Sequence, residues 1–215
     1  GSKEFNLAAN ISEGTGSLEL IPTTNERYYL ALSKAGTGNL EIKRSGFELR
    51  LQGAKSAGSG DFYLDTQGKI FRGGADKTAG TGYAGYKNGS DSIFVALPSS
   101  TELVLNSNFS NNSINFNINK SGQGSAVFKN SSIALYAGAN KSAKSGYFGF
   151  KNNSDSLYTL VDGSQSKGIF YLALGSKLVN AEATAGNGTM KLKDGSKEFN
   201  LAANISEGTG SLELI

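Results

Sequence analysis

The sequence predicts an all-β fold, and we expect a parallel β-solenoid with coils of about 22 residues. Two observations support this. First, glycine recurs every 22 or 20 residues within stretches rich in Gly, Ser and Thr, except near Ser99 to Thr101, where one such stretch lacks the glycine. Second, the residues between these stretches alternate between apolar and polar, which is typical of β-strands with one buried face, and no stretch of ten residues has helical spacing. The recurring glycines are Gly16, Gly38, Gly60, Gly82, Gly124, Gly146, Gly168, Gly188 and Gly210.

The expected strands follow one another along the chain as short alternating segments separated by turn-forming residues. Each segment places its large apolar side chains at every second position, so that one face of the strand is apolar. The clearest segments are residues 5–9, 18–20, 40–42, 47–51, 62–64, 114–118 and 190–192.

The chain is also a slice of a tandem array. Residues 1–21 recur identically as residues 195–215, so the long repeat unit is 1–194 and the next copy begins at 195. Residues 75–94 resemble residues 139–158, which indicates sub-repeats of about 65 residues. Fixed periods of this kind are typical of proteins in which each unit contacts only its neighbours. We therefore treat residues 1–215 as one continuous repeat segment.

An antiparallel hairpin meander with the same period is the alternative fold. It is favoured by Asn88-Gly89, Asp162-Gly163 and Asp194-Gly195, which suit two-residue hairpin turns. We prefer the solenoid because a coil encloses its own apolar face, whereas a single-layer meander leaves that face exposed.

Composition narrows the function. Histidine and cysteine are absent, which excludes the usual catalytic triads and zinc sites, and the carboxylates are scattered. We expect no enzyme, no metal site and no cofactor. The net charge is +3 with interspersed signs, so nucleic acid is not an expected partner. No apolar run is long enough for a transmembrane helix.

Two sets of residues are candidates for binding. The first set consists of lysines that recur just ahead of the glycine-bearing stretches. A stacked fold would align these lysines into a row that binds an anionic glycan. Its alternative role is a solvated turn that also prevents edge pairing. The second set consists of aromatic residues, which would form a patch that binds sugar rings. Their alternative role is to pack between repeats around an Asx-capped turn. The candidates are Lys34, Lys55, Lys77, Lys120 and Lys141, and Tyr83, Tyr86, Tyr147 and Phe150.

The coils at Ser17 to Leu20 and Ser132 to Ala137, with the lack of Cys, Trp and His, resemble the repetitive passenger or stalk regions of bacterial surface adhesins. Autotransporters and filamentous-haemagglutinin-like proteins are such families. The resemblance implies a non-enzymatic stalk or fibre on the bacterial cell surface, in the extracellular space, with neighbouring repeats as partners. The alternatives are a glycan-binding or polysaccharide-acting β-helix, which would bind cell-surface glycan, and a self-associating filament subunit.

Overall fold

The computed structural model describes residues 3–215, which form only strands and turns, so the all-β prediction is confirmed. The chain divides into two compact units, Gly1–Ser110 (unit 1) and Asn111–Ile215 (unit 2). Unit 1 contains β1 (Glu4–Asn10), β2 (Thr15–Thr23), β3 (Glu26–Ser33), β4 (Thr37–Arg44), β5 (Phe47–Ala54), β6 (Ser59–Thr66), β7 (Lys69–Asp76), β8 (Thr81–Asn88), β9 (Asp91–Ser99) and β10 (Glu102–Phe109). Unit 2 contains β11 (Asn112–Asn119), β12 (Gln123–Asn130), β13 (Ile133–Asn140), β14 (Ser145–Asn152), β15 (Asp155–Asp162), β16 (Lys167–Leu174), β17 (Lys177–Thr184), β18 (Asn187–Asp194), β19 (Lys197–Asn204) and β20 (Thr209–Leu214).

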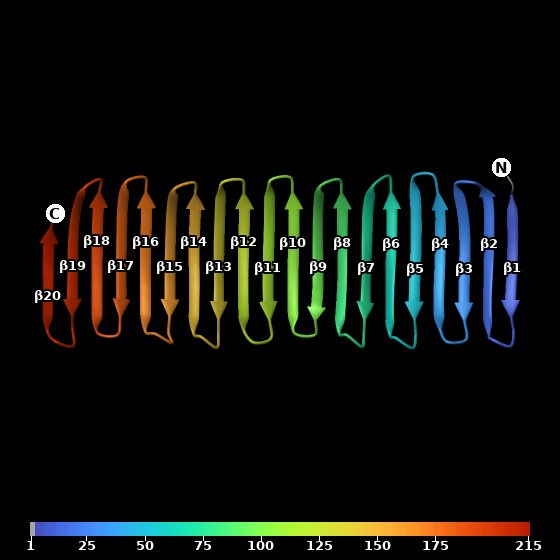
Figure 1. Cartoon of the computed structure of the whole chain (residues 1–215), viewed down its shortest axis with the longest axis horizontal. Helices are drawn as coiled ribbons and strands as arrows, with labels where there is room; N and C mark the ends of the chain where they lie inside the picture. The colour runs from blue at the N-terminus through green and yellow to red at the C-terminus, as the bar shows by residue number, and fades with distance from the viewer. Residues whose placement is uncertain (1–2) are drawn as a thin grey trace. The chain divides into compact units, whose positions relative to one another are not determined.

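Within each unit every strand pairs antiparallel with the next strand in sequence, as Figure 1 shows. The preferred prediction, a parallel solenoid, was therefore wrong, and the alternative meander is confirmed. The physical reason lies in the connections. In a solenoid the paired strands lie one coil apart, whereas here the two-residue turns carry glycine with positive φ (70° at Gly46 and 61° at Gly89) and reverse the chain, so that consecutive strands pair directly. Each 22-residue period is one hairpin rather than one coil.

The recurring glycines also lie elsewhere than expected. Gly38 is the second residue of β4 and Gly146 the second residue of β14, so these glycines are in strands and not in turns. Of the three expected hairpin turns, Gly89 and Gly195 begin two-residue turns with φ of 61°. Gly163 begins a turn of four residues.

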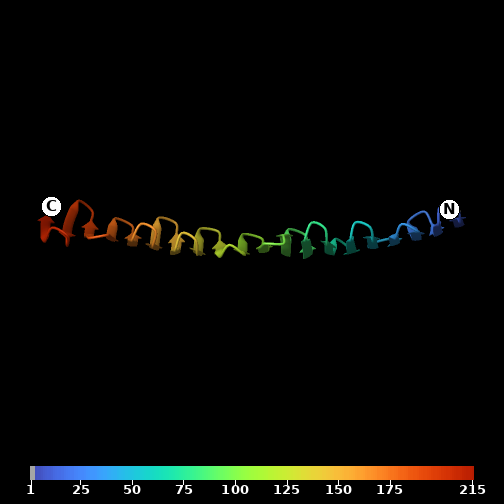
Figure 2. The ribbon, with the colours of Figure 1, turned by 90° about the horizontal axis from the view of Figure 1, so that it is seen from below.

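Each unit is a single-layer sheet, and Figure 2 shows no second layer on either face. No hydrophobic residue among the described residues is buried. The accessible surface is 13957 Å², whereas a compact monomer of this 22.4 kDa mass exposes about 9,400 Å². The hydrophobic side chains therefore form a face and not an enclosed core.

Cross-strand register keeps the two faces of each unit chemically distinct, because paired residues share a face. The side that carries large apolar residues is called the apolar face, and the opposite side is called the polar face. In unit 1 the apolar face carries Phe5, Leu7, Leu18, Leu20, Tyr28, Leu30, Leu32, Leu40, Ile42, Leu49, Leu51, Phe62, Leu64, Phe71, Tyr86, Ile93, Val95, Leu97 and Leu105. In unit 2 it carries Ile114, Phe116, Ile118, Phe128, Leu135, Phe148, Phe150, Leu157, Val161, Phe170, Leu172, Leu174, Val179, Met190, Leu192, Phe199, Leu201, Leu212 and Leu214.

The turns at each edge of the sheet hydrogen-bond to neighbouring turns at the same edge. Turns that follow odd-numbered strands form the long-turn edge, and turns that follow even-numbered strands form the short-turn edge. At the long-turn edge, which is the lower edge in Figure 1, the amide of Lys34 donates to the carbonyl of Gly14 at 2.6 Å. Lys55 donates in the same way to Gly36 at 2.9 Å. The antiparallel ladder therefore continues through the turns, which fixes the position of each hairpin against the previous one.

The sub-repeat of about 65 residues has a structural cause. At the end of β1, β7, β13 and β19, an Asn or Asp side chain accepts a hydrogen bond from the backbone amide three residues later, closing a four-residue Asx turn. The residues are Asn10, Asp76, Asn140 and Asn204, which are spaced 66, 64 and 64 apart. A turn of this kind recurs at every sixth strand, and Asp162 at the end of β15 forms one more outside this spacing.

Replacing Asn140 by alanine should destabilise its turn by about 1 kcal/mol, because the amide of Ala143 loses the acceptor that lies 3.1 Å away. Native-state hydrogen exchange of the Ala143 amide measures this directly. Asn115→Ala is the control, since Asn115 lies exposed within β11 and away from any turn. Equal exchange rates in the two variants would contradict the role of the Asx turn.

Candidate functional site

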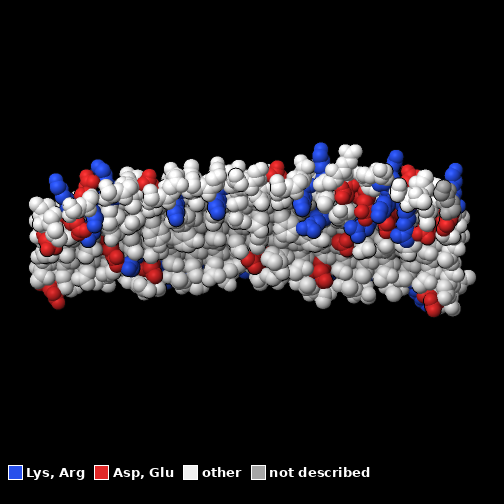
Figure 3. Space-filling model, turned by 45° about the horizontal axis from the view of Figure 1, so that its top comes forward, with Lys and Arg blue, Asp and Glu red and all other residues white. Residues whose placement is uncertain are grey.

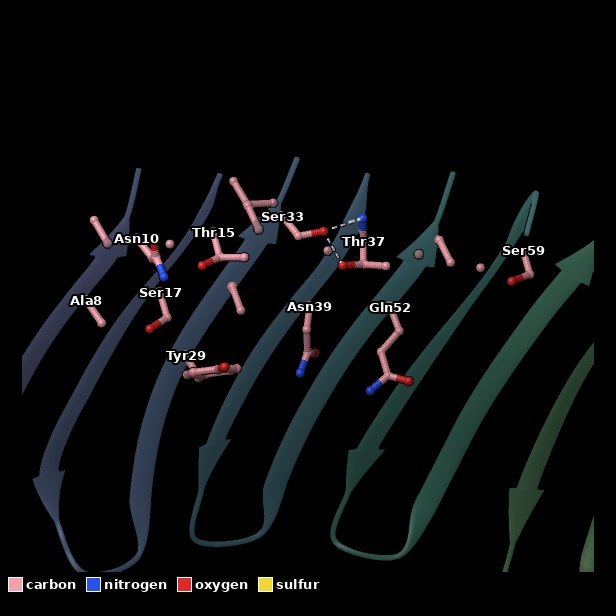
Figure 4. A pocket seen from close by; sticks show the side chains of 18 of the residues that line it. Ala8, Asn10, Thr15, Ser17, Tyr29, Ser33, Thr37, Asn39, Gln52 and Ser59 are labelled. Carbon is pink, nitrogen blue, oxygen red and sulfur yellow. Dashed lines mark hydrogen bonds between the residues drawn. The ribbon is translucent and has the colours of Figure 1, made fainter. Parts of the chain in front are cut away.

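A groove with a volume of about 670 Å³ lies on the polar face of unit 1. It crosses β1 to β6 next to the long-turn edge (Figure 4). Its side chains are small or uncharged and polar, apart from Leu32 and Asp61. They include Ser17, Thr37, Asn39, Gln52 and Tyr29.

Cross-strand register produces this groove. One row of paired positions runs from Ala8 through Ser17, Ala31 and Asn39 to Gln52, and most of these side chains are short. The neighbouring row carries larger side chains, so its Tyr29 forms a wall (Figure 4). The Oδ1 atom of Asn39 is shielded from solvent and has no hydrogen-bond partner within the protein. The groove can therefore offer hydroxyl and amide groups beside an aromatic ring.

Charged side chains lie beside the groove in a network centred on Arg27. Its Nε is 2.6 Å from Glu19 Oε1, its Nη1 is 3.2 Å from Glu41 Oε2, and its guanidinium lies 4.6 Å from the ring centre of Tyr29. The hydrogen bond to Glu19 raises the pKa of Arg27. In Figure 3 the charged side chains over unit 1 gather in a band, while much of the remaining visible surface is uncharged. The network thus holds Tyr29 in place at the groove wall.

A similar cluster lies further along the polar face of unit 1. Arg50 is 2.9 Å from Glu48 and 4.5 Å from the ring centre of Tyr63. Burial, followed by the hydrogen bond that Tyr63 donates to Asp65 at 3.2 Å, raises the pKa of Tyr63. Because Arg27 and Arg50 both lie over tyrosine rings, the polar face repeats one arrangement of guanidinium and aromatic ring.

The candidate lysines all lie exposed at the long-turn edge. Lys34, Lys55 and Lys77 occupy three successive turns of unit 1, and Lys120 and Lys141 occupy two successive turns of unit 2. Successive lysine-bearing turns are separated by the width of two strands, about 10 Å, because only every second turn lies at this edge. In unit 1, Lys34 and Lys55 directly follow Ser33 and Ala54, which line the groove.

The candidate aromatic residues do not form one patch. Tyr83 and Tyr147 lie on the polar face, whereas Tyr86 and Phe150 lie on the apolar face of the same strands. Tyr147 packs over Gly138, where an added Cβ would come within 2.6 Å of the ring. Tyr83 packs in the same way over Gly74, with the ring 3.0 Å from such a Cβ. Tyr83 and Tyr147 therefore have a packing role across neighbouring strands.

The aspartates of the same sub-repeat motif also have structural partners. Asp91 accepts a hydrogen bond from the amide of Ser110 at 2.9 Å, and Asp155 accepts one from the amide of Gly175 at 2.9 Å. Each carboxylate thereby links its strand to the next turn on the short-turn edge. Among the described residues no group of three or more acidic residues is arranged to hold a metal ion.

In unit 2 the polar face carries an ion cluster around Glu198. Its carboxylate lies 2.9 Å from Lys191 Nζ and 3.1 Å from Lys193 Nζ, with 18% of the side chain exposed. The hydrogen bonds from Lys191 and Lys193 lower the pKa of Glu198 from an ordinary value of 4.5 to about 2.

Acid should therefore destabilise this part of the sheet in a defined pH window. A carboxyl group with a depressed folded-state pKa contributes stability above its unfolded pKa, and this is lost as the pH falls from about 4.5 to about 2. We expect the urea midpoint of unfolding to fall across this window, and less so in Glu198→Gln. Carboxyl ¹³C NMR of the wild-type chain should give a Glu198 pKa near 2; in the Lys191→Met, Lys193→Met double variant, a Glu198 pKa that stays near 2 would contradict the assignment.

Sequence reasoning missed the groove and the arginine network. Both follow from the polar positions that alternate with the leucines, such as Glu19 between Leu18 and Leu20. The alternation assigns these side chains to one face. Which of them become neighbours depends on the register of antiparallel pairing, which a parallel fold would have set differently.

Comparison with known proteins gives no relative: no family model matches the chain, and no curated protein matches it. Within residues 3–215 there is no helix long and apolar enough to cross a membrane.

Proposed function

We propose that this chain is a non-enzymatic structural and adhesive repeat segment of a long extracellular protein, acting as a stalk or fibre on the bacterial cell surface. The observation that carries this proposal is the pairing pattern. Among the described residues of each unit, strands contact only the strands before and after them in sequence. A further hairpin can thus be appended with the same backbone hydrogen bonds and without rearranging the existing ones.

The repeat also matches this role at the level of side chains. The Asx turns and turn-to-turn hydrogen bonds recur along both units, so each hairpin is positioned by its neighbour. The identity of residues 1–21 with residues 195–215 means that the segment that follows one period carries the same pairing groups as the segment that begins it. Such a protein supplies length and many equivalent surfaces rather than a single catalytic site.

Small-angle X-ray scattering of this chain, and of the same chain extended by one and two further 194-residue periods, tests the proposal. We expect the maximum dimension to increase by an equal amount with each added period. A maximum dimension that grows only as the cube root of the mass would indicate collapse into a globule and would reject the stalk.

Glycan binding is a second candidate, favoured by the groove of unit 1. Planar amides, hydroxyl groups and the ring of Tyr29 are groups that bind the hydroxyls and apolar faces of sugar rings. Lys34 and Lys55 at the adjoining edge would add attraction for an anionic glycan, and this contribution would weaken with salt.

A glycan array, probed at low and high salt, tests this candidate. Tyr29→Ala should abolish binding in the groove, whereas Tyr28→Ala is the matched control because Tyr28 lies on the apolar face. Loss of binding on Lys34→Glu and Lys55→Glu, at low salt only, would assign the lysines to an anionic ligand. Binding that Tyr29→Ala leaves unchanged would remove the groove from consideration.

A further inference from the structure

The apolar face of unit 1 is a broad hydrophobic surface on which large side chains alternate with small ones such as Gly73 and Ala84. Exposed side chains such as Leu7 (73%), Leu32 (59%) and Leu97 (49%) lie on it, from the first strand to the ninth. Within β1–β9, the charged residues that share this face are Glu26, Arg44, Lys69 and Asp91. Each of these four begins or ends its strand at the short-turn edge, so no charge lies in the middle of the face.

The size of this face exceeds what a soluble monomer ordinarily exposes. Ten strands at about 4.8 Å and roughly six residues at about 3.4 Å give an area of about 1,000 Å². The largest apolar patch on a typical monomer is about 300–600 Å². A stable protein interface buries about 800 Å² on each partner, so this one face is large enough to form such an interface.

We propose that the apolar face is covered in solution by the same face of a second copy of this chain, giving a two-layer sheet with both polar faces outward. The inference rests on the proposed structural function and names the partner of the repeat. A second copy fits because two pleated apolar faces pack at about 10 Å with interdigitating side chains. A partner that bound through salt bridges could pair only with the four charged residues at the short-turn edge of this face.

Two further observations favour a copy over an unrelated partner. The sequence itself begins to repeat at residue 195, so an array of this protein presents the same face again in every period. The apolar face of unit 2 also has a hollow of about 420 Å³, lined by Leu172, Val179, Leu192, Phe199 and Leu214, with the charged residues Lys177, Asp194 and Lys197 at the short-turn edge. The aromatic and branched side chains of the same face on another copy have the chemistry to fill it.

Light scattering and sedimentation of the 215-residue chain over a range of concentrations test the proposal. We expect twice the mass of one chain, and not higher multiples, because the outward polar faces end the stacking at two layers. Leu30→Lys, in the middle of the apolar face, should weaken association at least 10-fold. Ala31→Lys, the next residue and on the polar face, should leave it unchanged.

Leu30→Lys could also prevent folding, so a second measurement uses folded protein. The chain has no cysteine, so Leu30→Cys and Ala31→Cys each introduce one thiol. We expect the thiol of Leu30→Cys to react slowly with maleimide and to become reactive on dilution, while that of Ala31→Cys reacts at every concentration.

Three results would overturn the proposal. One is a monomer in which both thiols react equally, and another is a monomer in which the Leu30→Cys thiol stays protected, which would mean that the chain covers its own face. The third is a monomer that floats with phosphatidylcholine vesicles unless Leu30→Lys is present, which would make lipid the occupant. These outcomes are read from the mass of the particle and from the reactivity of a thiol on the apolar face. The X-ray scattering test of the stalk does not depend on either, so the two proposals can fail separately.

Discussion

Replacing Gly36 by alanine is expected to destabilise the turn between β3 and β4 by about 2–4 kcal/mol. Gly36 has φ of 80°, where an L-residue costs about 1–2 kcal/mol. The added Cβ would also lie 2.6 Å from the Cβ of Lys55, in the next turn along the edge. Because that atom is bonded directly to the backbone, relief of the overlap must move the strand end.

Gly68 provides a matched control, since its φ of 82° is nearly the same but no atom lies within 4 Å of the position that a Cβ would take there. Gly68→Ala should therefore show only the conformational cost, about 1–2 kcal/mol. Hydrogen exchange of the Lys55 amide, which donates to the Gly36 carbonyl at 2.9 Å, measures the difference locally. Equal effects in the two variants would show that contact between successive turns contributes nothing.

The local structure was predictable from the sequence because it depends on residues close together in the chain. Alternation correctly placed Leu18 and Leu20 on one face. Turn chemistry correctly indicated two-residue turns at Gly89 and Gly195, although these turns are Gly89-Ser90 and Gly195-Ser196, one residue later than the expected Asn88-Gly89 and Asp194-Gly195. The 22-residue period was also correct as a length. Each of these signals is carried by a few neighbouring residues whose conformational preferences are intrinsic.

The direction of pairing was predicted wrongly because alternation has the same period in parallel and antiparallel sheets. The choice was made on burial, by assuming that one chain must enclose its own apolar face. The structure leaves Leu32 and Leu97 exposed, so burial within the chain does not decide the fold here. The conformation of the turns does, because Ser45-Gly46, with φ of 70° at Gly46, reverses the chain so that β4 and β5 pair directly.

The candidate site was predictable only in part, for a related reason. The lysine row was found because it repeats in sequence at turn positions. Tyr83 and Tyr86 were grouped because they are close in sequence, but three residues along a strand place side chains on opposite faces. The groove joins residues from six strands, and its shape depends on pairing register.

The second large effect is expected at Gly149, where a valine should destabilise the pairing of β13 with β14 by about 2–3 kcal/mol. Gly149 is buried beneath the ring of Tyr136, its cross-strand partner, and any Cβ at this position would overlap that ring. Tyr147 of the same strand covers Gly138 of the neighbouring strand in return, and the two rings lie 6.2 Å apart. A side chain at Gly149 would push Tyr136 off the sheet and expose backbone that the ring now shields.

Two controls make this prediction specific to the ring. Gly146→Val, on the same strand, should be neutral or slightly stabilising, because the nearest atom to its Cβ is a carbonyl oxygen at 3.5 Å and valine favours strands. In a Tyr136→Ala background, Gly149→Val should lose most of its cost, since the double-mutant cycle removes the overlap. Hydrogen exchange of the amides of β13 and β14 measures both effects. If Gly149→Val were equally destabilising in the Tyr136→Ala background, the cause would be the backbone and not the ring. The same Gly/aromatic pairing joins Gly74 and Tyr83 in unit 1, so the sub-repeat preserves a way of shielding a single-layer sheet that has no core to do so.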